Sequence, residues 1–315
     1  MMISLTTHLE NYLVIRRTLG YDLSFQERVL RRFTGFADAQ GADHVTVNLF
    51  LAWKEHFGSA NQQTWSHRLS MVRVFATWLQ SVDPRNEVPP QSLILGKYRR
   101  THPYIYTSRE IEKIVTEAAK LPSPYGLRGW TYATLFGLIA VTGLRIREAI
   151  GLDDTEVDLD EAVLLIRSAK NQSIRLLPIS SSTASRLKSY RIVRNRILYS
   201  CDPAFFMHER GRRLTDCCVR YNFARICQRI GLRDQQRFHK HGQGPRIHDL
   251  RHSFAVRTIM DWYQKGLDPD REMIKLSTYL GHTKPKNTYW YIEAVPELLG
   301  AALERAELSI NGGAS

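Results

Sequence analysis

The sequence contains no apolar run long enough to cross a membrane. Its longest such run, residues 131–141, falls well short of the roughly 20 residues that a spanning helix needs. The N-terminus also lacks the basic segment followed by an apolar stretch that is typical of a secretory leader. These features predict a cytoplasmic protein that has no membrane partner.

Cysteine is scarce as well. The four cysteines, Cys201, Cys217, Cys218 and Cys227, do not have the paired spacing of zinc ligands. Because nothing marks the chain as secreted, we expect reduced thiols that pack as small apolar residues. The sequence also has no internal repeat and no low-complexity segment.

Positive charge, in contrast, is abundant. The formal net charge is +13, which would concentrate a polyanion near the surface and speed its encounter with the protein. Nucleic acid is the leading partner class, and a generally basic surface that only keeps the chain soluble is the alternative. Residues 1–100 and the remainder are both basic, as a protein that clamps a duplex between two domains would require.

The length of 315 residues favours two domains. Apolar residues recur at spacings of three and four from Leu5 to about Ser81, which predicts a small helical domain. We therefore expect a helical domain at residues 1–84, a linker at 85–105 and a second domain at 106–315.

The expected linker is rich in proline and ends in a basic run. Four prolines lie between residues 83 and 103, and Lys97, Arg99 and Arg100 lie among them. This composition is typical of an exposed connection, and the basic run could follow a phosphate backbone.

The second domain is predicted to be mainly α-helical with one β-hairpin, an α+β fold. Two β-favouring runs, Ala162–Ile166 and Ile174–Ile179, face each other across a polar segment and predict the hairpin. The helical pattern and its start and stop signals predict a helix that begins near Thr107. They also predict helices at residues 182–198, 216–230, 250–263, 271–280 and 296–308.

A first basic motif, Thr142-Gly143-Leu144-Arg145, lies at an expected helix boundary. Gly143 can end one helix just before another begins, which would project Arg145 from a rigid corner. The alternative is that Arg145 merely pairs with Glu148 on a solvated helix.

A second motif follows about a hundred residues later. His248 and Arg251 are three residues apart and therefore lie on one face of a helix start. After a further helix come Leu280-Gly281-His282, and Tyr291 lies nine residues beyond that histidine in an aromatic cluster. Taken singly, a structural histidine and a packed aromatic cluster are the commoner explanations.

In this order and spacing the motifs resemble the tyrosine recombinase and phage integrase family. The family's catalytic set is Arg, Lys, His, Arg, His or Trp, and Tyr. The matching positions are Arg145, Lys170 in the hairpin turn, His248, Arg251, His282 and Tyr291. The resemblance covers roughly residues 107–295 and implies a tyrosine recombinase catalytic domain.

The N-terminal region resembles the family's helical, SAM-like core-binding domain in pattern only. Gln62, Thr64, Arg68 and Arg73 are the DNA contacts that this resemblance suggests on one helix. The partner implied is double-stranded DNA, bound by a homotetramer on two sites, with related recombinases as possible additional partners. The final apolar helix would dock on a neighbouring protomer or serve as ordinary core.

The residue types suit attack on a phosphodiester. Arg145 and Arg251 would bind the nonbridging oxygens, and His248 and His282 would add hydrogen bonds. Tyr291 would attack with His248 as the base, and the resemblance assigns protonation of the 5′ leaving oxygen to Lys170. No acidic cluster that could hold magnesium lies near these motifs, so we expect neither a metal nor another cofactor.

Three features depart from the family pattern or compete with it. Arg147 occupies a position that is small and polar in many relatives, and we expect it to pair with a nearby acid. Tyr289 lies two residues before Tyr291, so on a helix the two side chains diverge by roughly 200° and only one can address a given phosphate. The turn that holds Lys170 lacks the glycines common in relatives.

Two alternatives stay open at this stage. A type IB topoisomerase would nick and religate one duplex with similar chemistry, and a catalytically inactive architectural protein would only bind DNA. The sequence favours a recombinase that serves a mobile element. It does not specify the target site, nor whether Tyr291 acts in its own subunit or a neighbour's.

Overall fold

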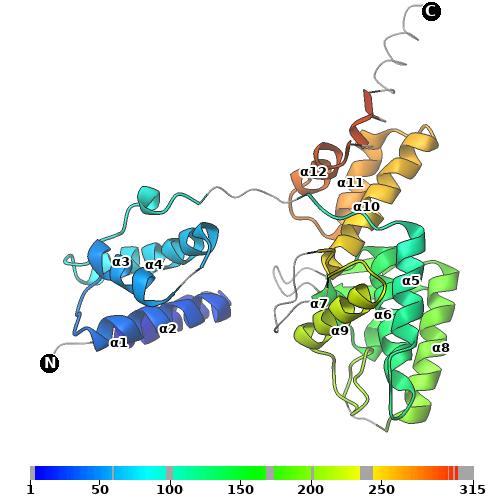
Figure 1. Cartoon of the computed structure of the whole chain (residues 1–315), viewed down its shortest axis with the longest axis horizontal. Helices are drawn as coiled ribbons and strands as arrows, with labels where there is room; N and C mark the ends of the chain where they lie inside the picture. The colour runs from blue at the N-terminus through cyan, green and yellow to red at the C-terminus, as the bar shows by residue number, and fades with distance from the viewer. Residues whose placement is uncertain are drawn as a thin grey trace, which may run out of the picture. The chain divides into compact units, whose positions relative to one another are not determined.

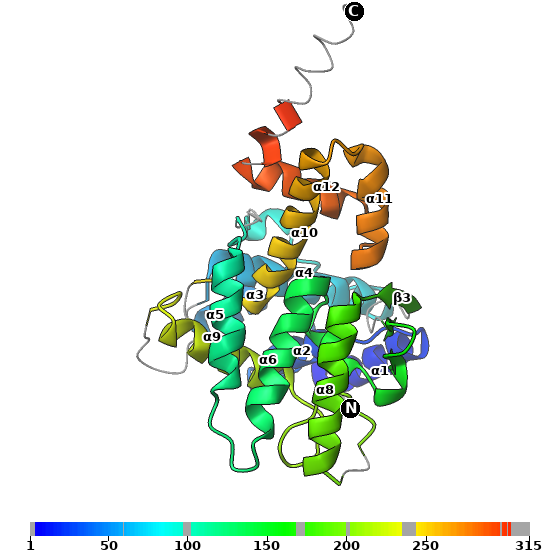
Figure 2. The same ribbon diagram turned by 90° about the vertical axis from the view of Figure 1, so that its right-hand side faces the viewer.

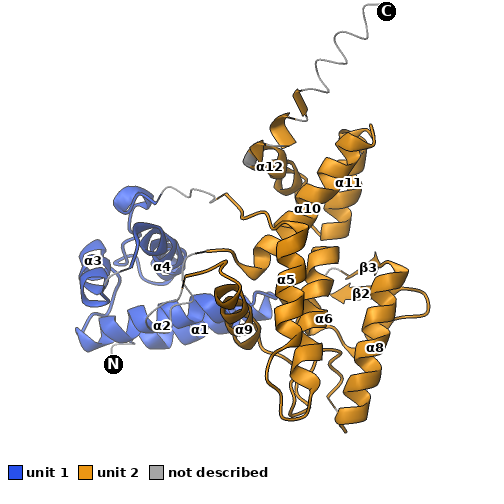
Figure 3. Cartoon of the chain, turned by 45° about the vertical axis from the view of Figure 1, so that its right-hand side comes forward, with its two compact units in different colours: residues 1–101 blue, residues 102–315 orange. Residues whose placement is uncertain are grey.

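The structure is a computed structural model that describes residues 4–58, 60–96, 102–167, 174–199, 202–234, 244–296, 298–300 and 302–303. The chain divides into two compact units, residues 1–101 and 102–315, which are coloured separately in Figure 3. Each unit has its own hydrophobic core, and the two are described separately below.

The regular secondary structure in the described part of unit 1 is all helical, as the periodicity between Leu5 and Ser81 predicts. Its helices are α1 (Leu5–Thr18), α2 (Ser24–Ala39), α3 (Val47–His56), α4 (Gln62–Val82) and a short 3-10 helix, η1 (Gln91–Leu93). Ser4, Thr46 and Asn61 cap α1, α3 and α4 by accepting a hydrogen bond from a backbone amide of the first turn.

The core of unit 1 combines aliphatic side chains with a cluster of packed aromatic rings. Trp53 lies edge-on to Phe33 and Trp65, with ring centroids 5.3 and 5.2 Å apart. Such pairs add about 0.5–1.5 kcal/mol each to the stability that buried area alone provides. The segment after α4 joins this core, because Asn86 accepts a hydrogen bond from the Val45 amide and Ile94 is buried. The expected linker is thus anchored to unit 1 along part of its length.

Unit 2 is a set of helices around the long apolar helix α6 (Figure 1). Its helices are α5 (Ser108–Ala119), α6 (Leu127–Thr142), α7 (Ile146–Gly151), η2 (Asp154–Glu156), α8 (Ser181–Ile197), α9 (Asp216–Arg229), α10 (Ile247–Gln264), α11 (Pro269–Leu280) and α12 (Lys286–Ala294). Helix α6 is buried on nearly all sides and contacts α5, α8 and α10. Its position fixes the ends of the helices that carry the candidate site.

A three-stranded antiparallel sheet lies beside these helices, in the order β1 (Val157–Asp158), β2 (Val163–Arg167), β3 (Ile174–Pro178). Leu164 pairs with Leu177, and both are buried. The predicted hairpin is therefore confirmed. Its first strand begins one residue late, because Ala162 has φ +52° and turns the chain between β1 and β2.

Helices α10, α11 and α12 gather at one end of unit 2, where they enclose a second small core (Figure 2). The predicted boundaries of the helices that begin near 107, 182, 216, 250 and 271 agree with the structure to within a few residues. Most of the final helix expected at 296–308 lies outside the described residues, although 296, 298–300, 302 and 303 are helical.

The cysteines follow the expectation only in part. Cys227 is a buried free thiol in the core of unit 2, and Cys218 is partly buried. Cys217 is exposed, so the expectation that it packs in the interior is wrong: it occupies the first turn of α9, on the side away from the core. Cys201 lies outside the described residues. No helix in the described part of the chain is long and apolar enough to span a membrane.

Candidate active site

Arg145 lies at the corner that the sequence predicts. Helix α6 ends at Thr142, and Gly143 caps it with φ +64°, a conformation that glycine adopts without strain. A side chain at this position would also collide with Phe254, because its Cβ would lie 2.7 Å from that ring. Arg145 then precedes α7 in an extended conformation, with its side chain 37% exposed.

Glu148 and the carbonyl oxygens at the end of α11 orient the Arg145 guanidinium. Its Nη1 lies 2.8 Å from Glu148 Oε1, and its Nη2 donates to the Gly281 carbonyl oxygen at 3.1 Å. The pairing with Glu148 that the alternative interpretation proposed is therefore present. It does not compete with a role in the site, since the contact to Gly281 brings Arg145 to the motif that contains His282.

Arg251 reaches the same place from α10. It is 1% exposed, and its two terminal nitrogens donate to the carbonyl oxygens of Gly143 at 2.7 Å and Leu280 at 2.8 Å. Burial, followed by the charge of Arg145, lowers the pKa of Arg251 to about 10, so the group stays protonated at neutral pH. Arg145 and Arg251 thus converge on the end of α11, although more than a hundred residues separate them.

His248 lies in the first turn of α10, one turn before Arg251 and His252. Its ring is exposed at the surface of the site and packs edge-on against the ring of His252, with centroids 4.7 Å apart. Desolvation within the site, followed by the charges of Arg251 and Arg145, lowers the pKa of His248 to about 4. His248 is therefore neutral at physiological pH and able to accept a proton.

His282 follows the glycine that ends α11. Gly281 has φ +67°, and a Cβ there would lie 2.7 Å from Nη1 of Arg175. His282 Nδ1 is 2.7 Å from the hydroxyl of Thr288, which is fully buried in α12. This contact ties the loop between α11 and α12 to the helix that carries the candidate nucleophile.

Tyr291 projects from α12 into the small core between α10 and α12. It is 2% exposed, and its hydroxyl oxygen lies 3.0 Å from Nδ1 of His252. It is also close enough to Arg251 for its charge to influence the pKa of that guanidinium. Tyr289 points elsewhere, since its hydroxyl donates to Asp270 at 3.2 Å. The expected divergence of the two tyrosines is confirmed.

The structure therefore brings five of the six expected catalytic residues to one end of unit 2, namely Arg145, His248, Arg251, His282 and Tyr291. Lys170 lies outside the described residues. Arg147 pairs with Asp216 at 3.5 Å on the surface, as expected.

The sequence predicted no functional role, or only a structural one, for three residues near this site: Glu148, Arg175 and His252. Glu148 is buried and accepts hydrogen bonds from Nη1 and Nη2 of Arg175, at 3.1 and 3.0 Å, as well as from Arg145. The signal for Arg175 was a lone arginine in an apolar strand. The signal for His252 was its position four residues after His248, on the same helical face.

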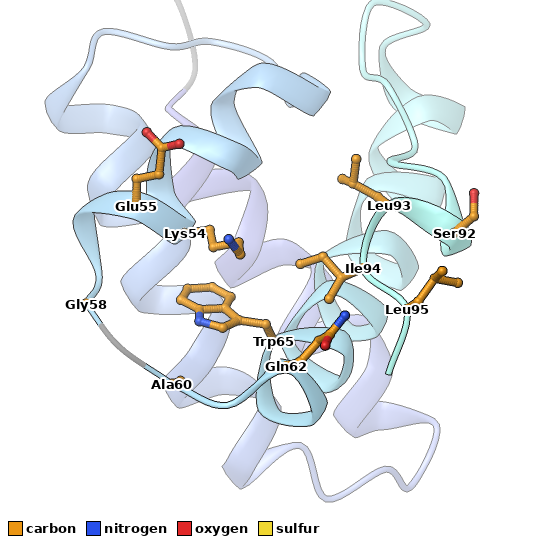
Figure 4. A pocket seen from close by; sticks show the side chains of 10 residues that line it. All are labelled: Lys54, Glu55, Gly58, Ala60, Gln62, Trp65, Ser92, Leu93, Ile94 and Leu95. Carbon is orange, nitrogen blue, oxygen red and sulfur yellow. The ribbon is translucent and has the colours of Figure 1, made fainter. Parts of the chain in front are cut away.

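The four DNA contacts expected on one helix, Gln62, Thr64, Arg68 and Arg73, all lie on α4. Gln62 and Thr64 are exposed in its first turn, and Gln62 lines an open pocket of about 620 Å³ together with Lys54 and Trp65 (Figure 4). The Arg68 guanidinium packs over the rings of Phe57 and Trp65, 4.6 and 4.5 Å from their centroids.

Arg73 donates to the carbonyl oxygen of Pro89 and so holds the segment after α4. Lys97, Arg99 and Arg100 lie outside the described residues. Among the residues that are described, no group of three or more His, Cys, Asp or Glu side chains could hold a metal ion.

The fold and the converging basic side chains define a DNA strand-transfer enzyme of the tyrosine recombinase class, and comparisons with known proteins agree. The model of the Phage integrase family matches residues 105–297. A protein of Sinorhizobium fredii (strain NBRC 101917 / NGR234) that carries the name integrase/recombinase y4rB is 38% identical over 303 residues, which are 95% of each chain. The chain belongs to the phage integrase family.

More distant relatives extend this picture. The tyrosine recombinase XerC of Roseiflexus castenholzii is 28% identical, over 72% of this chain and 67% of its own. Among solved structures, the XerH site-specific recombinase bound to a palindromic difH substrate aligns over 90% of this chain and 80% of its own, with a TM-score of 0.64 and 20% identity. The Tn1549 transposon integrase in complex with transposon right end DNA aligns over 96% and 99%, with a TM-score of 0.66 and 16% identity. These structural matches establish a shared fold.

Proposed function

We propose that this chain is a site-specific recombinase of a mobile DNA element that cuts double-stranded DNA with Tyr291 as the nucleophile. The convergence of Arg145 and Arg251 on residues 280 and 281, directly before the helix that holds Tyr291, is the observation that carries the proposal. The family of the chain and the likeness of its fold to a transposon integrase support it.

The arginines supply what a phosphodiester under attack requires. Negative charge grows on the nonbridging oxygens, and guanidinium groups bind such oxygens with two parallel hydrogen bonds while staying protonated. Arg145 is half-exposed and faces the incoming phosphate, and Arg251 provides a buried positive charge behind it. Fixed donors of this kind are worth about 3–4 kcal/mol each in the transition state.

Attack by Tyr291 forms a 3′ phosphotyrosine bond and releases a 5′ hydroxyl. A phenol needs a proton acceptor because its ordinary pKa is near 10. The neutral imidazole of His248 serves that role or binds the phosphate with His282, and Lys170 protonates the leaving oxygen. Because the phosphotyrosine bond retains the energy of the broken one, rejoining requires no ATP, metal or other cofactor.

Unit 1 is assigned the core-binding role, with a helical domain at residues 1–84, a linker at 85–105 and a catalytic domain at 106–315. Gln62 and Thr64 are exposed on α4 and available to DNA, whereas Arg68 and Arg73 also have contacts within unit 1. The charges of Lys97, Arg99 and Arg100 would follow the phosphate backbone of the DNA.

The active assembly is proposed to be a homotetramer on two DNA sites. A lambda integrase tetramer bound to a Holliday junction shares the fold, with a TM-score of 0.60 over 90% of this chain. Strand exchange between two duplexes requires one nucleophile for each of four strands, which four protomers provide.

A nicked duplex that carries the element's own end sequence tests the function. Loss of the short fragment beside the nick traps a covalent adduct, which runs as a slow, DNA-linked band in a denaturing gel. We expect an adduct, and exchange of strands when two labelled duplexes are supplied. An adduct without exchange would indicate a topoisomerase, and DNA binding without an adduct would indicate an architectural protein.

A further inference from the structure

His252 lies beside the proposed nucleophile, although it is not one of the six residues that match the family's catalytic set. Its Nδ1 is 3.0 Å from the Tyr291 hydroxyl oxygen, within hydrogen-bond distance. The two ring centroids are 5.5 Å apart at 62°, and the indole of Trp290 packs against the same imidazole at 5.8 Å. Aromatic rings on α12 therefore hold the imidazole in place.

The two histidines of α10 lie at different depths. His248 and His252 are four residues apart on one face of the helix, with their rings edge-to-face at 4.7 Å. His248 is exposed and has Arg145 and Arg251 as its nearby charges, which is where a phosphate would bind. His252 is partly buried, and its contact is with the phenol instead.

We propose that His252, and not His248, accepts the proton of Tyr291 when the chain cleaves DNA. The inference rests on the proposed function, since it concerns the same reaction. A neutral imidazole with its proton on Nε2 leaves the Nδ1 lone pair free to accept from the phenol. His248 is then left to donate a hydrogen bond to the phosphate.

Two proton transfers accompany the proposed cleavage. The Tyr291 oxygen forms a bond to phosphorus while its proton moves to Nδ1 of His252, which becomes an imidazolium. The bond between phosphorus and the 5′ oxygen breaks, and that oxygen takes a proton from the leaving-group acid. Rejoining reverses both transfers, so His252 returns its proton to the phenol.

The packing of α12 on α10 holds the imidazole of His252 beside the phenol of Tyr291. Tyr291 is 2% exposed, and its hydroxyl contacts a group on α10, the helix that also holds Arg251. A phosphate that enters beside Arg251 therefore meets the phenol oxygen with its proton acceptor attached. Preorganisation of this kind avoids a rearrangement during the reaction.

The test measures single-turnover adduct formation by full-length His252→Ala and His252→Gln on the nicked duplex. Both variants should form the adduct at least about 100-fold more slowly than the unaltered protein, since general base catalysis contributes about that much or more. Glutamine retains a hydrogen bond but accepts no proton, so recovery in His252→Gln would overturn the proposal and indicate a positioning role. Gln264→Ala, on the exposed part of α10, is the matched control and should keep the full rate.

Two further measurements test whether the His252 variants fail to remove the proton of Tyr291 or fail to protonate the leaving oxygen. Fluorotyrosine at position 291 has a more acidic phenol and should restore much of the rate in His252→Ala, as should added imidazole. A duplex with sulfur as the bridging 5′ atom has a better leaving group and should not restore it. Rescue by the sulfur substrate, with none by fluorotyrosine or imidazole, would overturn the proposal.

The outcomes separate this inference from the proposed function. If the unaltered protein forms no adduct, the proposed function fails. If the unaltered protein and both His252 variants form it at equal rates while thermal melting shows all to be folded, only the inference fails.

Discussion

The carboxylate of Glu148 accepts hydrogen bonds from both terminal nitrogens of Arg175, at 3.1 and 3.0 Å. The same carboxylate contacts Arg145 at 2.8 Å, so one buried acid joins the arginine of β3 to the arginine that precedes α7. Arg175 also donates to the Tyr279 carbonyl oxygen, near the end of α11. Arg145, the proposed phosphate ligand, is therefore held by a network of ion pairs and hydrogen bonds.

Glu148→Gln should lower both stability and activity. Removing one partner of a buried ion pair leaves the remaining charges uncompensated, and the loss is about 3 kcal/mol of unfolding free energy. Urea unfolding at pH 7 measures the stability, and adduct formation measures the activity. A variant with unchanged stability would show that the network contributes little.

The stabilising effect of Glu148 should depend on pH. Burial alone would raise the pKa of this carboxyl, but hydrogen bonds from Arg175 and the Arg145 amide outweigh it, so the pKa is lowered. The unfolded carboxyl binds a proton at a higher pH than the folded one. The unfolding free energy that the unaltered protein gains over Glu148→Gln is therefore complete above the ordinary carboxyl pKa of 4.5. It declines as the pH falls through the lowered pKa of the folded state. Parallel curves of unfolding free energy against pH for the two proteins would contradict this prediction.

Gly281→Ala should disturb the same network from the other side. Its positive φ costs an alanine about 1–2 kcal/mol, and the new Cβ would also lie 2.7 Å from Arg175 Nη1. Gly266→Ala is the matched control, because Gly266 has φ +66° and no neighbour within 4 Å. Both variants should lose thermal stability, but only Gly281→Ala should also slow adduct formation. Equal rates in the two variants would argue against a role for Arg175 in placing Arg145.

His248 should remain neutral at pH values well below the usual pKa of a histidine. As the pH falls, the His248 side chain of the unfolded chain takes up a proton near pH 6.5, whereas that of the folded chain takes it up only near its lowered pKa of about 4. Stability should therefore fall as the pH drops from 6.5 towards 4. Nuclear magnetic resonance of the labelled ring in the DNA-free protein measures the midpoint directly. A midpoint at 6.5 or above would refute the electrostatic description of the site.

Substitutions on α4 should separate DNA contact from stability in unit 1. Gln62→Ala and Thr64→Ala alter exposed side chains, so they should weaken DNA binding and leave the melting temperature unchanged. Arg73→Ala should also lower the melting temperature, because the side chain donates to the Pro89 carbonyl oxygen. Fluorescence anisotropy at two salt concentrations and thermal melting measure the two effects. Full DNA affinity in the first two variants would remove them from the proposed interface.

Much of this architecture could be predicted from local signals. The helix boundaries followed from apolar spacing and capping residues, and the hairpin followed from two β-favouring runs around a polar segment. The corner at Gly143 was evident because a glycine before an arginine suits the left-handed end of a helix.

Other features depended on contacts between distant segments, which spacing does not encode. Arg175 and Glu148 are 27 residues apart and meet only because β3 packs beside α7 and α11. His252 follows His248 by four residues in the sequence, but its contact with Tyr291 arises from the packing of α12 on α10. The positive φ of Ala162 likewise had no sequence signal, since alanine rarely adopts it.

Identification of the tyrosine that becomes linked to DNA tests the central claim most directly. The nicked duplex should be incubated with the unaltered protein, Tyr291→Phe and Tyr289→Phe, and the DNA-linked peptide identified by mass spectrometry. Tyr291→Phe should bind DNA and form no adduct, whereas Tyr289→Phe, which loses only a surface hydrogen bond to Asp270, should react normally through Tyr291. An adduct that persists in Tyr291→Phe, or a phosphotyrosyl peptide centred on Tyr289, would contradict the account.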